Sequence, residues 1–455
     1  MTIDELWVLI GAKYHKQLRP VQKIVLYQSW EGYSFAQIAK QSGFTQDHLK
    51  NIASKLWSLL SDLFNETLTK KTFRAILEPR SLSVLERELI AQATPLMREY
   101  PLESPDGPVP LESRFYIQRT PIEELTCTAI STPGSLIRLK SPKRMGKTSL
   151  MVRVLAHARQ LGYRTVSLNL QQVDRACLTD LDSFLRSFCL MLSRPLKWES
   201  KLDDYWDDFL GSKSNCTIYL EDYLQAHHNS PLVIALDRVE ELFLYPIIAA
   251  EFFAMLRYWH EKASFGDGES ELWKNLRLIL VYSTEEYLAL KTNHSPFNVG
   301  FVHKLPLFTS FQVEELAERH QLDLSVEQIE QFMELVAGHP YLVRLGFYHL
   351  AQQTVTWEEL MQTAATDTGI YHNHLHQHLA SLKVDPDLAV AYKEVLKANQ
   401  PIELEQQLAF RLHCLGLVNL QGSVVCSSCQ LYTDYFRDLR FESMQGFFYP
   451  SSIKN

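Results

Sequence analysis

A Gly-Lys-Thr triplet, Gly146 to Thr148, stands between a short apolar run, Leu136–Leu139, and a helical apolar pattern that opens at Leu150. Backbone N–H groups at a helix start have no intrahelical partner, and the helix dipole favours negative charge there. In such a loop the glycine admits phosphate close to the backbone, the lysine reaches the β- and γ-phosphates, and the threonine hydroxyl binds Mg²⁺. The pattern therefore predicts a loop that holds ATP with Mg²⁺. Its predicted nucleotide-binding residues are Ser141, Pro142, Lys143, Arg144, Met145, Gly146, Lys147, Thr148 and Ser149.

One position departs from the usual pattern G-x-x-x-x-G-K-[ST]. The first glycine is replaced by Ser141, which Pro142 follows. The loop must therefore turn without that glycine, and a Ser-Pro pair favours a turn. The alternative is a chance Gly-Lys-Thr at a helix start, but the apolar run before the loop and the helical pattern after it favour the phosphate-binding interpretation.

A second apolar run, Pro231–Asp237, ends in a carboxylate. A parallel strand that is buried on both faces is apolar throughout, and its carboxyl end would present Asp237 to the Mg²⁺ beside Thr148. The next position often carries a glutamate that polarises the attacking water, but here it is Arg238. Glu240 and Glu241 are the candidate catalytic substitutes. The alternatives are slow or absent hydrolysis in a site that acts as a switch, and a helix-surface pair between Arg238 and Glu241.

Two further positions are candidate sensors of the phosphates. The apolar run Leu276–Tyr282 predicts another buried strand, and Ser283 or Thr284 at its end would sense the γ-phosphate or simply cap a helix. Arg344 follows Pro340 by one helical turn, where it would reach phosphate or form a surface salt bridge.

Two residues are candidates for contact with the base. Ile117 lies in an aromatic and aliphatic segment that resembles the one covering adenine in switch-type ATPases; the alternative is an edge turn packed on the sheet. Pro340 belongs to a Gly-x-Pro that resembles the motif packing on the base in signalling ATPases, and proline is favoured at the first position of a helix.

These residues need a scaffold, and alternating strand and helix patterns predict a parallel sheet covered by helices. The predicted fold is an α/β P-loop NTPase domain, preceded by an all-α helix-turn-helix and followed by a helical lid and a winged helix. The proline-rich segment Pro101–Pro110 cannot continue a helix, so it marks a domain boundary. The predicted domains are 1–80 (helix-turn-helix), 81–112 (helix and linker), 113–305 (ATPase), 306–380 (lid) and 381–455 (winged helix).

The N-terminal module has the pattern of a helix-turn-helix. Helices are predicted over Pro20–Trp30, over Phe35–Ala39, and from Thr45 or Gln46 through Trp57, with turns at Glu31–Ser34 and Ser42–Phe44. Thr45–Lys55 is the candidate recognition helix. The pattern resembles that of sigma factor region four. Ten basic against seven acidic residues in positions 1–79 is a weak electrostatic footprint, so DNA binding, protein docking and a purely structural role all stay open. The candidate contacts to DNA or a protein partner are Thr45, Gln46, His48, Lys50 and Lys55.

Composition narrows the class of protein. The 455 residues suggest roughly three domains. A net charge of −8 argues against a protein that coats nucleic acid along its whole length. Neither a signal-peptide pattern nor an apolar stretch of about 20 residues is visible, so no membrane partner is expected. Seven scattered cysteines predict reduced thiols and a cytoplasmic protein.

The C-terminal region offers two further patterns. Helical stretches at Leu388–Asn399 and Glu403–Leu415, followed by a strand-turn-strand ribbon at Gly416–Val425, predict the winged helix. His374 and His378 share a helix face within a run of alternating histidines, but no carboxylate or cysteine completes a metal site. The run is therefore predicted to lie on a helix surface.

From about Ser113 to Arg440 the sequence resembles a family of bacterial AAA-like P-loop ATPases that are widespread in cyanobacteria and allied to the STAND class. The resemblance implies a nucleotide-dependent switch in signalling or defence, with nucleotide-dependent oligomers. The N-terminal module resembles the helix-turn-helix of proteins associated with MoxR and von Willebrand A systems. Relatives often read Asp-Glu where this chain has Asp237 and Arg238, which argues against efficient turnover. The stretches that carry the resemblance are Ser141–Leu150, Leu236–Phe243, Tyr245–Glu261, Ser283–Gly300, Gly338–Leu345, Gly369–His378 and Tyr432–Asp438.

The leading hypothesis is an ATP-binding switch, in which nucleotide state exposes the N-terminal module to DNA or a protein partner. The rival is a DNA-binding transcriptional regulator that uses its P-loop domain as an assembly platform. A third hypothesis is an inert scaffold with a degenerate site.

Overall fold

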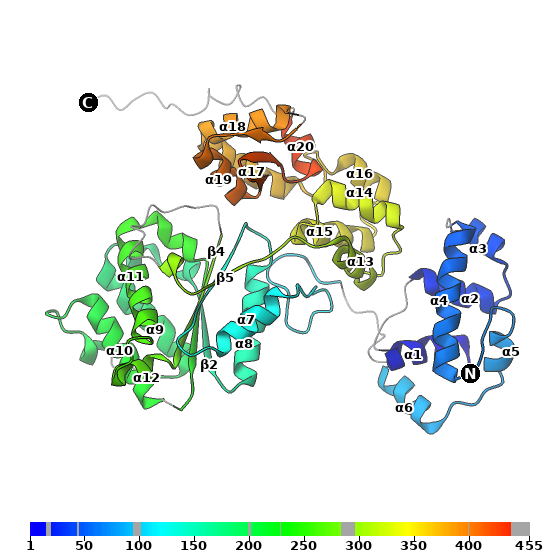
Figure 1. Cartoon of the computed structure of the whole chain (residues 1–455), viewed down its shortest axis with the longest axis horizontal. Coiled ribbons are helices and arrows are strands. Elements are labelled where there is room, and N and C mark those ends of the chain that lie inside the picture. The colour runs from blue at the N-terminus through cyan, green and yellow to red at the C-terminus, as the bar shows by residue number, and fades with distance from the viewer. Residues whose placement is uncertain are drawn as a thin grey trace. The chain divides into compact units, whose positions relative to one another are not determined.

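The structure is a computed structural model, and it describes residues 1–14, 20–42, 45–93, 102–198, 202–227, 229–283, 296–398 and 400–437 (Figure 1). The chain divides into two compact units. The first unit is Met1–Ser104 with Phe311–Ile329 and Phe347–Thr356, and the second is Pro105–Ser310 with Glu330–Gly346 and Trp357–Asn455.

The N-terminal part of the first unit is helical, as predicted. Its fourth helix begins at Gln46 as expected but continues beyond Trp57 to Phe64, because Leu60 extends the buried stripe formed by Leu49, Ala53 and Leu56. The predicted turn at Gly43 and Phe44 lies outside the described residues. The helices are α1 (Ile3–Tyr14), α2 (Pro20–Trp30), α3 (Phe35–Ser42), α4 (Gln46–Phe64), α5 (Phe73–Leu77) and α6 (Val84–Ala93).

An aromatic cluster closes the core of this part. The ring centroids of Trp57 and Phe73 lie 4.6 Å apart, and those of Trp30 and Phe73 lie 5.5 Å apart. A capping box starts α3, because the Gln37 N–H donates to Ser34 Oγ and the Ser34 N–H donates to Gln37 Oε1. Helices α3 and α4, the last two of the predicted helix-turn-helix, are thus positioned by the hydrophobic core of the N-terminal part itself.

The second unit is built on a five-stranded parallel sheet with the order β2-β3-β4-β1-β5. The register pairs Ser141 with Ser283 and Asn169 with Asp237, so the carboxyl ends of four strands meet at one edge. The strands are β1 (Leu136–Ser141), β2 (Arg164–Asn169), β3 (Leu232–Asp237), β4 (Leu276–Ser283) and β5 (Phe301–Lys304).

Strand β3 shows why the sequence folds this way. All of its residues are buried, because alternate side chains pack on opposite faces of the sheet. Val233 and Ala235 belong to the core under α7 and α8, whereas Ile234 and Leu236 belong to the core under the following helices. The sheet is therefore sandwiched between two helical layers (Figure 1). The helices are α7 (Ile122–Ser131), α8 (Lys147–Gln160), α9 (Leu181–Leu196), α10 (Ser212–Ala226), α11 (Pro246–Lys262) and α12 (Gly268–Trp273), with 3₁₀ turns η1 (Leu170–Gln172), η2 (Arg175–Leu178), η3 (Leu202–Tyr205), η4 (Val239–Leu244) and η6 (Pro296–Asn298).

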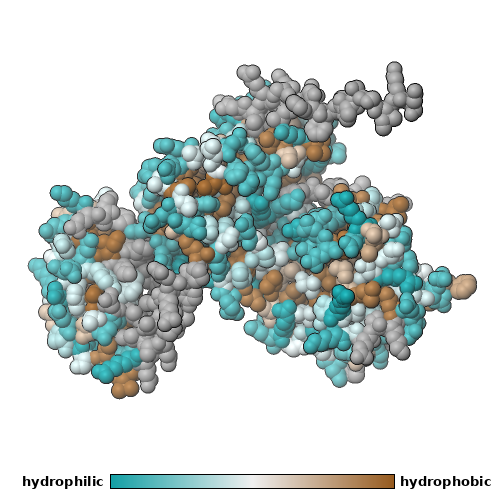
Figure 2. Space-filling view, turned by 180° about the vertical axis from the view of Figure 1, so that it is seen from behind, coloured by the Kyte–Doolittle hydropathy of each residue, from teal (hydrophilic) through white to brown (hydrophobic). Residues whose placement is uncertain are grey.

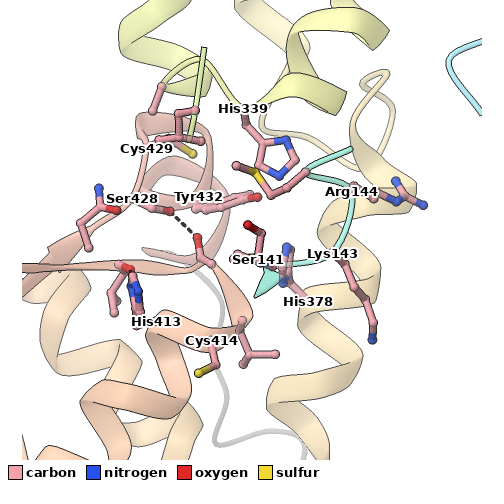
Figure 3. Close-up of a pocket in the computed structure, with 18 of the residues that line it drawn as sticks. Ser141, Lys143, Arg144, His339, His378, His413, Cys414, Ser428, Cys429 and Tyr432 are labelled. Atoms are coloured by element: carbon pink, nitrogen blue, oxygen red, sulfur yellow. Dashed lines mark hydrogen bonds between the residues drawn. The ribbon is translucent and has the colours of Figure 1, made fainter. Parts of the chain in front are cut away.

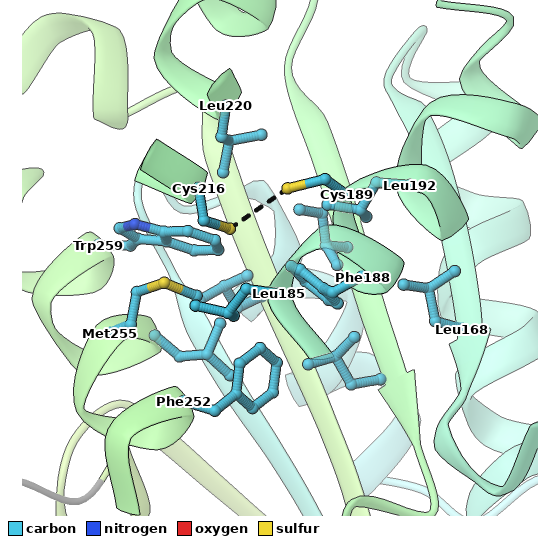
Figure 4. Packing of buried hydrophobic residues seen from close by; sticks show 14 of the residues in the cluster. Leu168, Leu185, Phe188, Cys189, Leu192, Cys216, Leu220, Phe252, Met255 and Trp259 are labelled. Atoms are coloured by element: carbon cyan, nitrogen blue, oxygen red, sulfur yellow. Dashed lines mark hydrogen bonds between the residues drawn. The ribbon is translucent and has the colours of Figure 1, made fainter. Parts of the chain in front are cut away.

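Large rings fill the core beneath α9, α10 and α11 (Figure 4). Phe188 and Phe252 meet edge to face at 5.1 Å, and Trp259 is 1% exposed. Cys189 and Cys216 point toward each other with their Sγ atoms 3.5 Å apart (Figure 4). All seven cysteines are free thiols.

Short helices and a small antiparallel sheet of order β6-β8-β7 follow the parallel sheet. The predicted strand-turn-strand ribbon is confirmed, and Pro340 starts a helix as expected. The elements are α13 (Ser310–Arg319), α14 (Val326–Val336), α15 (Pro340–Ala351), α16 (Trp357–Thr363), α17 (His372–Val384), α18 (Pro386–Lys397), β6 (Ile402–Glu403), α19 (Gln406–Leu415), β7 (Val418–Gln421), β8 (Val424–Ser427) and α20 (Gln430–Arg437).

The prediction of surface histidines on α17 is wrong for two of them. His374 and His378 are buried, and their Nε2 atoms lie 3.2 Å apart. His374 Nε2 also lies 2.6 Å from the Tyr432 hydroxyl of α20. The i,i+4 spacing that suggested a shared face is real, but that face packs against the terminal aromatic helix. Within the described residues, no group of three or more His, Cys, Asp or Glu could hold a metal ion.

The surface carries no extended apolar band on the face shown in Figure 2, where hydrophobic residues form groups separated by hydrophilic ones. A helix with the length and hydropathy of a membrane span does not occur in the described part of the chain.

Candidate functional site

The loop between β1 and α8 is shaped by two left-handed residues. Gly146, the N-cap of α8, has a φ of 87°, and Arg144 has a φ of 63°. Only glycine adopts such a φ without strain, and a Cβ at Gly146 would lie 2.8 Å from Nη2 of Arg119. The predicted glycine is therefore required both by backbone conformation and by close packing.

Lys147 lies inside this loop. Its Nζ donates to the carbonyl oxygens of Ser141 at 2.9 Å and Pro142 at 2.8 Å, and to Ser283 Oγ at 3.2 Å. Ser283 reaches the lysine because β4 lies between β1 and β3. The structure thus brings a predicted sensor residue to the ammonium group that would meet the γ-phosphate.

Thr148 and Asp237 form the corner of the site predicted for a metal ion. The Thr148 hydroxyl donates to Asp237 Oδ2 at 2.9 Å, and Asp237 is buried. Burial raises the pKa of Asp237, although the hydrogen bond from Thr148 opposes that shift. Two hard oxygen donors at one point suit Mg²⁺, which prefers a few protein oxygens together with water and phosphate oxygens.

The segment after Asp237 turns sharply. Arg238 has a φ of 58°, and its N–H donates to Asp237 Oδ1 at 3.0 Å. This left-handed turn leaves the Arg238 side chain exposed. The ion pair with Glu241, considered as an alternative, is not found among the described residues. Glu240 Oε2 is buried and makes no hydrogen bond within the described residues. Of the two candidate catalytic carboxylates, Glu240 is therefore the one that has an oxygen without a hydrogen bond near the proposed metal-binding residue Asp237.

Ser141 explains how the loop turns without its first glycine. The Leu305 N–H, just after β5, donates to Ser141 Oγ at 2.8 Å. Because the hydroxyl binds the neighbouring strand end, the Ser-Pro pair is fixed by a side-chain hydrogen bond instead of a glycine backbone conformation.

Residues 104–438 match the family model described as an AAA-like domain, and residues 2–80 match the one described as a vWA-MoxR associated protein N-terminal HTH. The chain belongs to the AAA-like family. A search of curated proteins finds no match.

One solved structure shares the fold of this AAA-like protein, and others match it with lower TM-scores. A Walker-type ATPase of Pyrococcus abyssi is 13% identical and superposes with a TM-score of 0.51, over 71% of this chain and 96% of that one. The Aeropyrum pernix ORC1 protein in complex with DNA is 11% identical over 72% of this chain and 94% of that one, with a TM-score of 0.35. AMPPCP-bound DnaA from Aquifex aeolicus is 16% identical over 65% and 75%, with a TM-score of 0.33.

The two residues predicted to contact the base, and the second candidate sensor, Arg344, are all buried in the AAA-like domain. Ile117 is buried, as is Pro340 at the start of α15. The Arg344 guanidinium lies 4.6 Å from the ring centroid of Phe115 and is buried, so the surface salt bridge considered for it is wrong. The segment before β1 and helix α15 therefore meet through a stacked arginine and phenylalanine.

Arg119 was missed by the sequence interpretation. Its Nη1 donates to the Met145 carbonyl oxygen at 2.7 Å, and the side chain is 4% exposed. An arginine two residues after Ile117, in the segment before α7, was the available signal, but spacing alone gave no reason to place it on the loop. The guanidinium supports the loop from outside, at the glycine that needs a special φ.

Replacing Arg119 with alanine should loosen the loop. We expect a loss of about 1.5–3 kcal/mol in the free energy of unfolding, because a buried hydrogen bond from a charged donor is lost. We also expect ATP to bind roughly tenfold more weakly, which corresponds to about 1.4 kcal/mol. Denaturant unfolding and titration with a fluorescent ATP analogue measure the two effects.

Arg159→Ala is the matched control, because Arg159 lies at the far end of α8 and bonds Thr165 Oγ1 at the surface. Equal effects of the two substitutions on ATP affinity would contradict the role given to Arg119.

Four of the five N-terminal candidates are exposed residues in α4 or just before it. Thr45, Gln46, Lys50 and Lys55 are exposed, whereas the side chain of His48 lies outside the described set. The Lys50 ammonium is 3.1 Å from Asp47 Oδ1, with the two side chains 50% and 90% exposed. An ion pair this open is weak, so Lys50 remains available to a stronger anion.

The buried histidines of α17 make stability depend on pH. Burial lowers the pKa of His378 to about 4, with Lys143 and Arg144 adding to the shift, and burial lowers the pKa of His374 well below its usual value. Because both folded pKa values lie below that of the unfolded chain, unfolding takes up protons below about pH 6.5. Stability is therefore present above that pH and is lost as the pH falls toward 4.

Denaturant unfolding of the wild-type chain and of His378→Gln between pH 7 and pH 4.5 tests this dependence. Each histidine should add a slope of up to about 1.4 kcal/mol per pH unit, and the variant should lack the share of His378. Identical slopes for the two proteins would contradict the assignment.

Proposed function

We propose that this AAA-like protein is an ATP-binding molecular switch with slow ATP hydrolysis. The observation that carries the proposal is the hydrogen bond of 2.9 Å between the Thr148 hydroxyl and Asp237. Thr148 directly follows Lys147, the lysine of the loop. A hydroxyl, a carboxylate and an ammonium group at one helix start form the set of groups that Mg·ATP requires.

Each residue has a role in this proposal. When ATP binds, the Lys147 ammonium exchanges its hydrogen bonds to the carbonyl oxygens of Ser141 and Pro142 for bonds to phosphate oxygens. The N–H groups at the start of α8 face the same phosphates. Thr148 and Asp237 would hold Mg²⁺, which when bound neutralises charge on the β- and γ-phosphates. When the Lys147 ammonium moves toward a γ-phosphate, its hydrogen bond to Ser283 changes. The end of β4 therefore senses whether a γ-phosphate is present.

Hydrolysis in this proposal uses Glu240. The carboxylate accepts a proton from the attacking water, water oxygen bonds the γ-phosphorus, and the bond to the β-γ bridging oxygen breaks to leave ADP and phosphate. Arg238 supports this assignment indirectly, because its left-handed backbone moves residue 238 out to solvent and leaves Glu240 Oε2 buried beside Asp237. The departure from Asp-Glu therefore shifts the proposed base by two positions.

The switch would act through the parts that follow the sheet. We propose that α15 and the α18, α19 and β7–β8 elements serve as lid and winged helix, and that nucleotide state changes their placement. That change would alter access of the N-terminal module to DNA or a protein partner, in a cytoplasmic signalling or defence role, and would alter assembly of the chain.

Size-exclusion chromatography with light scattering tests the switch directly. The full chain is run with Mg·ATP, with Mg·ADP and without nucleotide, and bound nucleotide is quantified in each peak. A mass or elution volume that differs between ATP and ADP supports the proposal. Bound nucleotide with identical mass and elution in every state would leave a nucleotide-binding protein that does not switch.

A second candidate function is a DNA-binding regulator, favoured by the exposed polar face of α4. Duplex binding by the full chain, weakened strongly by salt and unchanged by nucleotide, would favour it over the switch. Binding that depends on both salt and nucleotide would unite the two functions.

A further inference from the structure

Phe209 has the most exposed large hydrophobic side chain in the described part of the chain, with 99% of its surface open to solvent. It lies in the loop between η3 and α10, next to Leu210, which is 51% exposed. Single exposed hydrophobic residues are common on protein surfaces, but two adjacent ones in a surface turn offer apolar area to a partner. Phe209 and Leu210 together form a knob of apolar surface.

The loop that carries the knob is fixed by hydrogen bonds. The Phe209 N–H donates to Asp207 Oδ1 at 2.8 Å, and Asn215 Nδ2 donates to the Asp207 carbonyl oxygen at 2.9 Å. Trp206 Nε1 donates to Asp182 Oδ1 at 2.6 Å, which ties the loop to α9. A side chain on a loop that is already ordered loses less conformational entropy when a partner covers it. The knob is therefore prepared for an interface.

A recess of about 410 Å³ lies between α10 and α11. Its lining begins at Lys213, in the first turn of α10, and so starts just after the knob in the chain. Among the described residues that line the recess, none belongs to the phosphate-binding loop or to η4. The recess is therefore separate from the proposed nucleotide site. Its apolar lining consists of Ile218, Ala254, Met255 and Tyr258.

The knob and the recess differ in charge. Residues 203–210 hold four aspartates and no lysine or arginine, and all four aspartates are exposed. The recess is lined instead by Lys213 and Lys262 and by one carboxylate, Glu221. Lys213 pairs with Glu251, but these side chains are 43% and 45% exposed, so the pair is weak and can be exchanged for the carboxylate of a partner. An acidic loop and a lysine-lined recess are complementary when they belong to two copies.

We propose that two copies of this chain form a dimer, in which the knob of each copy fills the recess of the other. The knob directly precedes α10 and the recess includes the first turn of that helix, so one two-fold axis brings both knobs to both recesses. The ring of Phe209 then leaves water and packs on Ile218 and Tyr258, as aromatic anchors do at the centre of interfaces. The groups that would bind Mg·ATP take no part, so this dimer forms without nucleotide.

Sedimentation equilibrium of the full chain without nucleotide tests the proposal. The wild-type chain should reach the mass of a dimer as its concentration rises. Phe209→Ser removes the anchor of the knob, and Ile218→Glu places in the recess a charge that repels the aspartates. Each substitution should weaken the dimer roughly 100-fold. Val384→Ser is the matched control, because Val384 is 86% exposed and lies outside both features, and it should leave dimerisation unchanged.

A mixture of the two variants gives a sharper result. A Phe209→Ser copy keeps its recess and an Ile218→Glu copy keeps its knob, so the mixed pair retains one of the two contacts. The mixture should therefore dimerise more strongly than either variant alone. A substitution that merely damaged the fold would not be rescued in this way, and thermal unfolding of each variant verifies the fold.

Three outcomes would overturn the proposal. They are a wild-type chain that stays monomeric at every concentration, a dimer that survives both substitutions, and a mixture that dimerises no better than its components. The first would leave the knob to a different protein. ATP titration of the same samples keeps the proposed function separate. The monomeric variants should bind ATP as the wild-type chain does, and a wild-type dimer that binds no ATP counts against the proposed function alone.

Discussion

Lys147→Ala is expected to weaken ATP binding by roughly 100-fold, which corresponds to about 2.7 kcal/mol. The reason is that, among the described residues, the Lys147 ammonium is the only cation inside the loop. Without nucleotide it donates hydrogen bonds to the carbonyl oxygens of Ser141 and Pro142. A charge-assisted bond to phosphate is stronger than those it replaces. Calorimetric titration of the full-length variant with ATP and Mg²⁺ measures the change.

Lys143→Ala is the matched control for this loss, because Lys143 lies in the same loop but extends away from Ser141 (Figure 3). It removes one positive charge from the loop without removing the ammonium inside it, so ATP affinity should fall far less. Wild-type affinity in Lys147→Ala, or equal losses in the two variants, would show that the nucleotide binds elsewhere or not at all.

Glu240→Gln is expected to slow ATP hydrolysis by roughly 10²–10⁴-fold, the usual contribution of a positioned base. ATP affinity should remain close to that of the wild type, because the amide keeps the shape of the carboxylate. The variant purified after incubation with ATP should retain ATP, where the wild-type chain retains ADP. Chromatography of the nucleotide released from the denatured proteins gives this readout without an activity assay.

Glu241→Gln provides the comparison, since Glu241 is adjacent in the same 3₁₀ turn, η4. Its hydrolysis rate and retained nucleotide should match those of the wild type. If Glu241→Gln retains ATP and Glu240→Gln does not, the base is misassigned. Absence of hydrolysis in the wild-type chain itself would make the site a binding switch alone.

Much of the fold was predictable because it rests on local patterns. A central strand such as β3 must be apolar throughout, and its end must carry Asp237 to the sheet edge, so position in sequence predicted position in space. The polar end of the buried strand β4, at Ser283, was predicted as a candidate sensor, whereas its pairing with Ser141 of β1 was not. In the N-terminal module, the turn residues and apolar spacing sufficed to predict α2, α3 and the start of α4.

The features that sequence reasoning missed depend on contacts between distant segments. His374 and His378 were predicted on a surface because polar residues favour water, but Tyr432, more than fifty residues later, supplies the hydrogen-bond partner that allows their burial. Arg119 acts on the loop through a carbonyl oxygen 26 residues away. The left-handed Arg238 could not be foreseen, because such a φ is rare for arginine and no local pattern demands it.

The most direct test of the central claim is calorimetric titration of ATP into the full-length wild-type chain, once with Mg²⁺ and once with a chelator. The claim is that Lys147, Thr148 and Asp237 together hold Mg·ATP. It predicts saturable binding that is tighter with Mg²⁺, and Asp237→Asn should abolish the advantage given by the metal. Failure of ATP to bind, or binding of equal strength with and without Mg²⁺, would contradict the claim.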